Sequence, residues 1–355
     1  MKKYYLVILV LFSFHGNSQV GIGTNNPHVS AILDLTSSNK GLLPPRMTLE
    51  QRNAIQNPIV GLVVWCANCG SVGEMQVFNG TVWTNLAGGA AATPFLLDKL
   101  LTTPVAAYSL RLLRSGYTGN PAIRVRRSSD NTETNIGFTN SGDLDETALL
   151  AFTGSSDGFV TTWYDQSGNN NHAINTNTAA QPQLVFAGVV NKMNNKPAIK
   201  STVARNTRLE RTPASAITIR QFSVVGQGEV NGSNYVNFLQ QAGPSAFFRY
   251  TPSGNIEAWF QGANTITSTS PQFTSSTKIY SADFTIGKLF ANGVEIGNNS
   301  VTSPTTSSAL YTLFNNPGNN FPLNGSMLEM ILFSSVVNRT LLEADQGTYY
   351  SIPVN

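Results

Sequence analysis

GFVTTWYDQSGNNNHA, residues 158–173, combines the two kinds of segment that recur through most of this chain. Its first part, GFVTTWY, is rich in β-branched and aromatic residues and predicts a buried strand. Its second part, with Ser, Gly and three consecutive Asn, is typical of a turn. From Phe95 to Ile352 turn residues return about every eight to twelve positions, a spacing that indicates an all-β sandwich or jelly roll.

Other segments support the same fold class. The dipeptide Asn292-Gly293 stands between KLFA and VEI and predicts a tight hairpin, because type I′ turns need positive φ at both positions. Short helices are expected after two N-cap residues, Thr48 and Asn338. Further strand-like runs are IRVRR at 123–127, FSVVGQ at 222–227 and MLEMILF at 327–333.

Composition and the first residues predict export. Charged residues make up 12% of the chain, about half the usual share. Lys2 and Lys3 precede an apolar run, Tyr4 to Phe14, which is too short to span a bilayer and predicts a secretory signal over residues 1–18. The net charge of +3 falls to +1 without those lysines, which argues against nucleic-acid binding. No later stretch is long enough to cross a membrane, so we expect a secreted or cell-surface protein.

The remaining chain divides at a linker of small residues. Residues 19–86 predict a small mixed or β module, AGGAAATP at 87–94 a linker, and residues 95–355 the sandwich. Cys66 and Cys69 are the two cysteines, and in an exported chain they predict a structural disulfide, with free thiols as the alternative. A zinc site would need further ligands that the few histidines do not supply.

The module resembles one found at the front of exported Gram-negative surface proteins. The resemblance rests on VGIGTNNP at 20–27, GLLPPRM at 41–47 and GEMQVFNGTVW at 73–83. It implies location and presentation rather than chemistry, and oligomerisation through this module is one expectation.

Residues 106–138, AAYSLRLLRSGYTGNPAIRVRRSSDNTETNIGF, followed by residues 158–173, are similar to the catalytic domain of α-L-arabinofuranosidase B, glycoside hydrolase family 54. The segments KLFANGVEIG and NGSMLEMILFSSVVNRTLLEADQ also resemble laminin-G-like jelly rolls. Together these resemblances imply a concanavalin-like β-sandwich and contact with a polysaccharide or surface glycan.

The resemblance also provides a chemical test. Retaining glycosidases need two carboxylates about 5 Å apart, one as nucleophile and one as acid/base. The resemblance implies that these lie near residues 235–250 and 313–325, yet neither segment contains Asp or Glu. Glu257, beside Trp259, and Asp283 are the substitute catalytic candidates. The leading hypothesis is therefore a glycan-binding or adhesive protein; an active arabinofuranosidase with relocated carboxylates and a component of an extracellular fibre or tail-like assembly are the alternatives.

Several residues are candidates for sugar contact, because aromatic faces pack on sugar CH groups while Asp and Asn bind hydroxyls. For Asp165 the alternative is closing the turn after a strand, and Trp163 is expected in the core. Phe247, Phe248 and Tyr250 form an aromatic cluster with the candidate Trp259. We expect this cluster in the core; the alternative is that an exposed subset of it binds a glycan. The glycan-binding candidates are Tyr164, Asp165, Asn171, His172 and Trp259.

The charged residues on the predicted strands are expected to stabilise the fold rather than to bind a ligand. Arg124 and Arg126 share one strand face and, with neighbouring Arg127, are expected to form ion pairs with acids such as Asp130 and Glu133 rather than to bind acidic glycans. Glu329 sits in an apolar strand and needs a partner, for which we expect Arg124 or Arg126. No cofactor is expected, although the Asn-rich loops 169–171 and 315–320 are possible places for Ca²⁺.

Overall fold

The computed structural model describes residues 19–355 except residues 71, 90, 92–93, 101, 212–215, 230–231, 233, 243–245, 260–264, 274–275, 301–306 and 309. The predicted signal segment, residues 1–18, lies outside the described residues. In the described part of the chain, no helix has the length and apolar character needed to cross a membrane. The helices are α1 (Leu49–Asn53), α2 (Leu96–Lys99), α3 (Glu146–Thr153) and α4 (Arg339–Tyr350), and the 3-10 helices are η1 (Ser115–Tyr117), η2 (Thr178–Ala180) and η3 (Val203–Arg205).

Strands account for most of the regular structure. Those before residue 95 are β1 (Val20–Ile22), β2 (Leu33–Leu35), β3 (Arg46–Met47), β4 (Val63–Cys66), β5 (Glu74–Phe78) and β6 (Trp83–Asn85). Those that follow are β7 (Ala106–Ser109), β8 (Ile123–Arg127), β9 (Glu133–Ile136), β10 (Gly158–Trp163), β11 (Ala173–Ile174), β12 (Gln183–Phe186), β13 (Val189–Val190), β14 (Lys192–Met193), β15 (Lys196–Pro197), β16 (Ile199–Ser201), β17 (Leu209–Arg211), β18 (Ile217–Thr218), β19 (Gln221–Gly228), β20 (Val236–Gln241), β21 (Phe247–Tyr250), β22 (Ile256–Trp259), β23 (Thr265–Thr267), β24 (Lys278–Asp283), β25 (Lys288–Ala291), β26 (Val294–Asn298), β27 (Ser307–Ser308), β28 (Tyr311–Leu313) and β29 (Gly325–Phe333).

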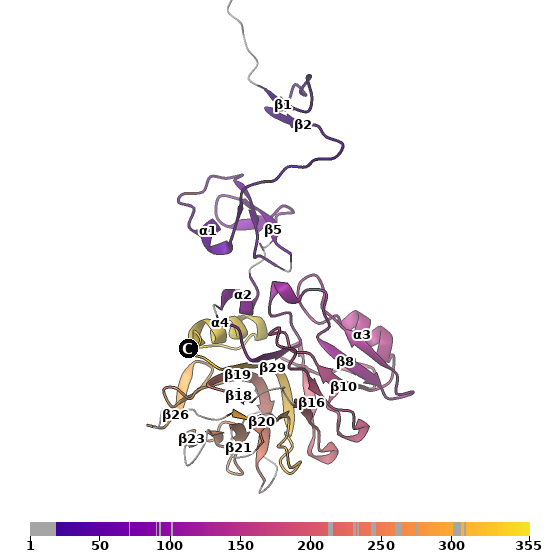
Figure 1. Ribbon diagram of the computed structural model, residues 1–355, viewed down its shortest axis with the longest axis vertical. Coiled ribbons are helices and arrows are strands. Elements are labelled where there is room, and N and C mark those ends of the chain that lie inside the picture. The colour runs from indigo at the N-terminus through magenta and orange to yellow at the C-terminus, as the bar shows by residue number, and fades with distance from the viewer. Residues whose placement is uncertain are drawn as a thin grey trace, which may run out of the picture.

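The N-terminal module consists of two small sheets that stand away from the rest of the molecule (Figure 1). Strands β1 and β2 form a two-stranded parallel sheet, and β3 to β6 form a four-stranded one. Helix α1 begins at the predicted N-cap, Thr48, whose hydroxyl accepts from the Gln51 N–H while the Gln51 side chain accepts from the Thr48 N–H. Cys66 and Cys69 form the predicted disulfide.

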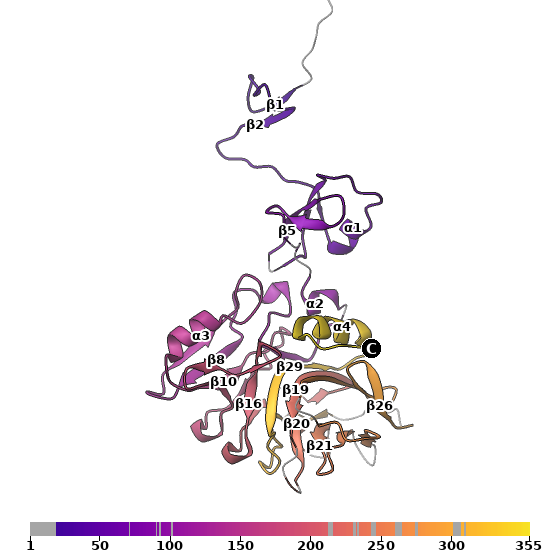
Figure 2. The ribbon, with the colours of Figure 1, turned by 180° about the vertical axis from the view of Figure 1, so that it is seen from behind.

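The larger part, called the body below, is a sandwich of two sheets that share β10. In the back sheet the order runs β9-β8-β10-β12-β16-β29-β19-β24-β25-β26, with β7 also paired to β29. In the front sheet the order runs β11-β17-β28-β20-β21-β22-β23, and β11 pairs with the second half of β10. Figure 2, the view from behind, shows the same two layers below the module.

Aromatic side chains fill the space between the two sheets. Phe222 from the back sheet lies 4.8 Å, between ring centroids, from Phe248 of the front sheet. The Tyr250 and Tyr280 hydroxyls join the sheets through a 2.8 Å hydrogen bond. Trp163 is fully buried in the same cluster, as expected. The predicted all-β sandwich with a small N-terminal module is thus confirmed.

Local signals were accurate where one short segment decides the structure. Asn292 and Gly293 have φ values of 49° and 86° and connect β25 to β26 as the predicted hairpin. The Asn338 side chain caps α4 through the Leu341 N–H (3.1 Å). Helix α3 was not predicted, because it is short and its apolar residues give little periodicity; Asp145, its N-cap, was the available signal.

Helix α4 covers the outer face of the back sheet and encloses a buried ion pair. Glu329, which is 0% exposed, accepts from Arg111 Nε at 2.8 Å rather than from Arg124 or Arg126, so that part of the sequence interpretation is wrong. The reason is register: Glu329 lies opposite Ser109 on β7, which brings Arg111 beside it. Arg124 instead pairs with Glu133 at 2.6 Å.

Candidate functional site

The turn after β10 is held together by Asp165. Its Oδ1 accepts from the Ala107 N–H (2.8 Å) and the Ser167 N–H (2.8 Å), and its Oδ2 accepts from the Asn171 N–H (2.9 Å). The Ser167 hydroxyl also donates to Oδ2 (2.7 Å), and the side chain is 1% exposed. A carboxylate with four such donors is engaged in closing the turn, so Asp165 does not present its oxygens to a sugar.

The three glycan-binding candidates near Asp165 are Tyr164, Asn171 and His172, and each already contacts other protein groups. His172 Nδ1 accepts from the Asp165 N–H (3.1 Å), and burial, ahead of the opposing effect of the nearby Asp165 charge, lowers the pKa of this histidine. Tyr164 lies edge-on to the His172 ring and donates to Asn135 Oδ1 (2.9 Å). Asn171 accepts from Arg211 Nε (3.0 Å) and lines a polar hollow of about 550 Å³. A sugar role for Tyr164, Asn171 and His172 stays a prediction.

The two segments in which the resemblance implies catalytic carboxylates lie side by side. Strand β20 pairs with β28, and the loop that follows β28 returns to β20, where the Phe321 carbonyl accepts from the Asn237 N–H (3.1 Å). Asn315 and Asn316 hold this loop, since their side-chain oxygens accept backbone N–H groups of residues 316–321. The polar side chains at this meeting point are therefore amides that organise backbone rather than acids.

An ordered row of side chains covers the outer face of the front sheet beside this meeting point. Phe247 and Trp259 are direct neighbours on β21 and β22 and stack with centroids 5.2 Å apart and planes at 11°. The Arg249 guanidinium carbon lies 3.9 Å from the Phe247 centroid and 3.7 Å from the Tyr235 centroid. We call Tyr235, Arg249, Phe247 and Trp259 the stacked strip; all four side chains are half-buried.

The strip divides the predicted aromatic cluster in two. Phe248 and Tyr250 alternate with Phe247 and Arg249 along β21, so the first pair packs in the core and the second faces outward. Tyr235 and Arg249 were missed in the sequence, although the FFRY alternation carried the signal.

The two catalytic candidates are not brought together. Glu257 lies beside the strip and accepts from Arg249 Nε at 3.0 Å. Asp283 ends β24 in the back sheet, where it accepts from the Thr285 N–H (2.9 Å) and closes a turn. Another acid on the front face, Glu210, is separated from Glu257 by three strands, or roughly 19 Å of sheet at the usual spacing. Glycosidase pairs lie roughly 5–9.5 Å apart, so neither combination fits.

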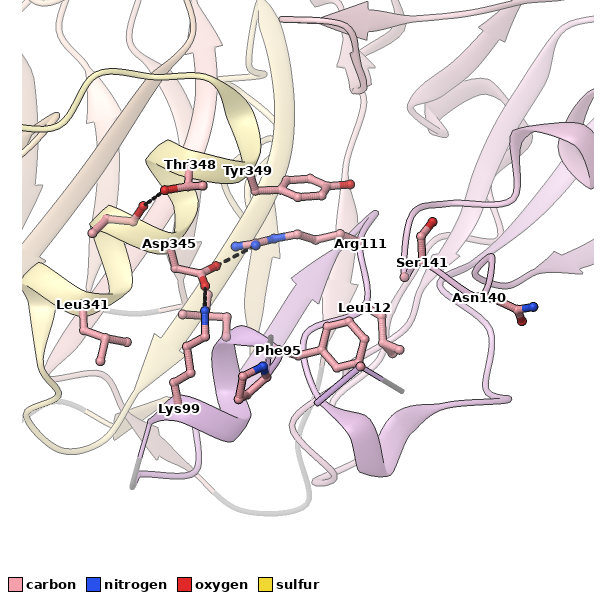
Figure 3. A pocket seen from close by; sticks show the side chains of 15 residues that line it. Phe95, Lys99, Arg111, Leu112, Asn140, Ser141, Leu341, Asp345, Thr348 and Tyr349 are labelled. Atoms are coloured by element: carbon pink, nitrogen blue, oxygen red, sulfur yellow. Dashed lines mark hydrogen bonds and ion pairs between the residues drawn. The ribbon is translucent and has the colours of Figure 1, made fainter. Parts of the chain in front are cut away.

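A hollow of about 610 Å³ lies elsewhere, between α2, α4 and the loop around Gly142 (Figure 3). Figure 3 shows Lys99 and Arg111 both directed at Asp345, which accepts from Lys99 Nζ (2.6 Å) and Arg111 Nη1 (2.7 Å). Much of the remaining lining is apolar, including Phe95. Each charged side chain in the described lining is held in an ion pair, since Arg111 also pairs with Glu329, so this lining offers no unpaired acid or base for catalysis.

Metal binding has little support in the described residues. Across these residues, His, Cys, Asp and Glu do not gather in groups of three or more that could hold an ion. In the Asn-rich loop 169–171, the side-chain nitrogens of Asn169 and Asn171 donate to backbone carbonyls of residues 104 and 105. The expectation of Ca²⁺ in these loops stays a prediction.

Two family models match the chain. Residues 99–221 match "Alpha-L-arabinofuranosidase B, catalytic", which confirms the resemblance stated from the sequence. Residues 21–100, which include the N-terminal module, match the family "Phage tail like trimerisation region". No curated protein matches the chain.

Solved structures similar to this chain include a GH54 α-L-arabinofuranosidase soaked with a cyclic sulfate inhibitor, at 17% identity and a TM-score of 0.48, with 70% of this chain and 63% of that chain covered. Another is an arabinofuranosidase complexed with arabinofuranosyl-α-1,2-xylobiose, at 17% identity and a TM-score of 0.46, with 70% and 62% covered. The sialidase CBM40 of Ruminococcus gnavus, bound to α2,3-sialyllactose, has 16% identity and a TM-score of 0.30, with 36% and 83% covered. The chain spans less than two thirds of the length of both arabinofuranosidase structures.

Proposed function

We propose that this protein is exported, assembles through its N-terminal module and holds glycans on its arabinofuranosidase B-like body without cleaving them. The observation that carries the proposal is the make-up of residues 235–250 and 313–325. These neighbouring segments lack acids, and they supply Tyr235, Phe247 and Arg249 of the stacked strip.

The chemistry of these side chains suits binding rather than hydrolysis. A sugar ring has apolar CH faces that pack on aromatic carbon, and hydroxyls that need amides or ions at the border. Aromatic carbon comes from the strip, while Gln240 stands directly opposite both Phe247 and Thr312 across the sheet. An amide cannot donate a proton to a leaving alkoxide or form a normal glycosyl ester, which leaves a surface that recognises sugar without a cutting pair.

Incubation of the purified protein with 4-nitrophenyl α-L-arabinofuranoside is expected to give no release of nitrophenol above the buffer rate, because neither Glu210 nor Asp283 lies within the spacing of a glycosidase pair from Glu257. The assay should include Glu257→Gln as a control. Turnover by the native chain that disappears in this variant would establish an active hydrolase and end the proposal.

Changing Trp259 to alanine is expected to weaken binding to an oligosaccharide selected on a glycan array by about fivefold or more, since one aromatic contact contributes about 1 kcal/mol in addition to the apolar area it buries. Isothermal titration calorimetry measures the change. Phe186→Ala is the matched control, because Phe186 is an exposed aromatic residue on β12, away from the strip. Equal affinities of native protein and Trp259→Ala would remove the strip from the binding surface.

A second candidate function is a structural component of a fibre or tail-like assembly. It is favoured by the match of residues 21–100 to a trimerisation region and by the exposed apolar side chains of the module. The two functions are compatible, because a trimer would present three strips and raise the avidity for a repeating polysaccharide.

A further inference from the structure

Among the described residues, Arg126 on β8 has no acidic partner, so the expectation that it forms an ion pair like Arg124 and Arg127 is wrong. Arg124 pairs with Glu133 (2.6 Å) and Arg127 with Asp130 (2.6 Å). Arg126, only 6% exposed, donates to neutral acceptors in η2 and in two neighbouring loop positions. These acceptors are Gln181 Oε1 (2.7 Å), Asn131 Oδ1 (2.7 Å) and the Thr178 carbonyl (3.3 Å).

A second arginine converges on the same place from η3. Arg205 Nη2 donates to the Thr178 carbonyl (3.2 Å), which is the acceptor that Arg126 also uses. Both guanidinium carbons lie near the Phe159 ring, at 4.9 Å for Arg126 and 4.2 Å for Arg205. The Nε of Arg205 is buried and has no hydrogen-bond partner within the described part of the chain.

The acid nearest in effect to Arg126 is already paired. Glu133, which acts electrostatically on Arg126, forms an ion pair with Arg124. Burial, followed by the like charge of Arg205, lowers the pKa of Arg126. Two cations that share one neutral carbonyl repel each other, and an anion bound at the accessible edge of the Arg205 guanidinium would relieve that repulsion.

Arg126 and Arg205 also lie next to the loop that borders the stacked strip. Asn206, the residue after Arg205, accepts from Asn315 Nδ2 (2.8 Å), and Asn315 belongs to the loop containing Phe321. The Phe321 ring in turn lies 5.7 Å from Tyr235 at the end of the strip. A polysaccharide lying on the strip could therefore extend over this loop toward the two arginines.

We propose that Arg126 and Arg205 form a binding site for the oxyanion group of an acidic polysaccharide, either a uronate carboxylate or a sulfate ester. Arg205, which is half-buried, supplies the direct hydrogen bonds through Nη1, which has no acceptor among the described residues, while the buried Arg126 is a positioning residue that adds positive charge behind it. The proposal goes beyond the glycan strip, since it names an anionic ligand and a separate place for the charge.

The test compares the full chain with two single variants, Arg205→Gln and Arg220→Gln. Arg220 is an exposed arginine just before β19 and serves as the matched loss of one surface charge. The probes are trigalacturonate, a sulfated dextran oligosaccharide and a neutral arabinan oligosaccharide, measured by calorimetry at low and at raised salt. Thermal unfolding of each variant verifies that the fold is kept.

Arg205→Gln is expected to weaken binding of one or both anionic probes by on the order of tenfold or more, while Arg220→Gln leaves it within about twofold. The probe that responds identifies the source of the anion, carboxylate or sulfate. Absence of binding by both anionic probes, or equal losses in the two variants, overturns the proposal. Binding of the neutral arabinan oligosaccharide depends on the stacked strip and not on the two arginines. A failure of the glycan-binding proposal would therefore appear separately, as no binding of this neutral probe.

Discussion

Replacing Glu329 with alanine is expected to lower the free energy of unfolding by about 3–5 kcal/mol, because it removes one partner of a buried ion pair. Arg111 keeps only Asp345 as an acidic partner after the change. Its guanidinium lies beneath α4, over the rings of Tyr349 and Tyr350, and the Arg111 side chain is only 8% exposed.

The size of this loss follows from the number of groups that Glu329 serves. Its Oε2 accepts from Ser109 Oγ (2.8 Å), Arg111 Nε (2.8 Å) and the Tyr350 hydroxyl (3.0 Å). Its Oε1 accepts from Arg111 Nη2 (3.2 Å) and Gln346 Nε2 (3.0 Å). Although burial disfavours the charge of Arg111, the Glu329 carboxylate raises the pKa of this arginine well above its usual value. Truncation leaves several buried donors without an acceptor.

The measurement is urea denaturation followed by circular dichroism, with Glu133→Ala as the matched control. Glu133 also forms an ion pair with an arginine, but both side chains are about a third or more exposed, so its loss should cost at most about 1 kcal/mol. The paired variant Glu329→Met with Arg111→Met should recover much of the stability, because it leaves no lone charge. Equal small losses for the two glutamates would contradict the buried network.

The comparison of Glu329 with the Asn292-Gly293 hairpin shows which features were predictable. The hairpin depends on the φ preferences of two adjacent residues, so the sequence contains all the information needed. The partner of Glu329 depends on pairing β7 with β29 across more than two hundred residues, and a one-position change of register turns every side chain to the other face. The prediction that Glu329 needs a partner was correct, whereas the choice of partner was not.

The same limit applies to the candidate site. Alternation within β21 predicts that Phe247 and Arg249 share one face, but only the register with β22 places Trp259 beside Phe247. The absence of acids in residues 235–250 was visible in the sequence. That this segment meets residues 313–325 in space required the pairing of β20 with β28. The location of Asp283 in the opposite sheet required the pairing of β24 with β19.

The N-terminal module is expected to be trimeric in solution. Placing an aspartate at each of two exposed apolar positions of the module is expected to convert the protein to monomers. Among the described residues of the module, Val64 and the two cysteines are the buried apolar side chains, too few for a core. The exposed apolar side chains are Val20, Ile22, Val29, Ile32, Leu33, Leu35, Leu42, Leu43, Ile59, Val60, Val72, Val82 and Leu86.

The exposed apolar side chains of the module indicate that it packs against a partner. Burying one Val, Leu or Ile completely is favourable by about 1.5–3 kcal/mol, so a module that leaves this many in water gains most of its stability by association. Strands β1 and β2 lead to the same conclusion, because an isolated two-stranded parallel sheet is not stable in water. The match to a trimerisation region makes two further copies of this chain the expected partners.

The variant Ile32→Asp with Leu43→Asp tests this at positions that are 81% and 71% exposed in a single chain, so the change removes few contacts within one chain and acts mainly on association. In the trimer both aspartates would be buried, which removes several kcal/mol of apolar burial per copy and adds the cost of desolvating charge. Light scattering coupled to size exclusion should give three chain masses for the native protein and one for the variant. Phe186→Asp, a change at a 60% exposed apolar position on the body, should leave the trimer intact. A native monomer, or a variant that keeps the trimer mass, would show that the module's apolar surface does not join copies of this chain.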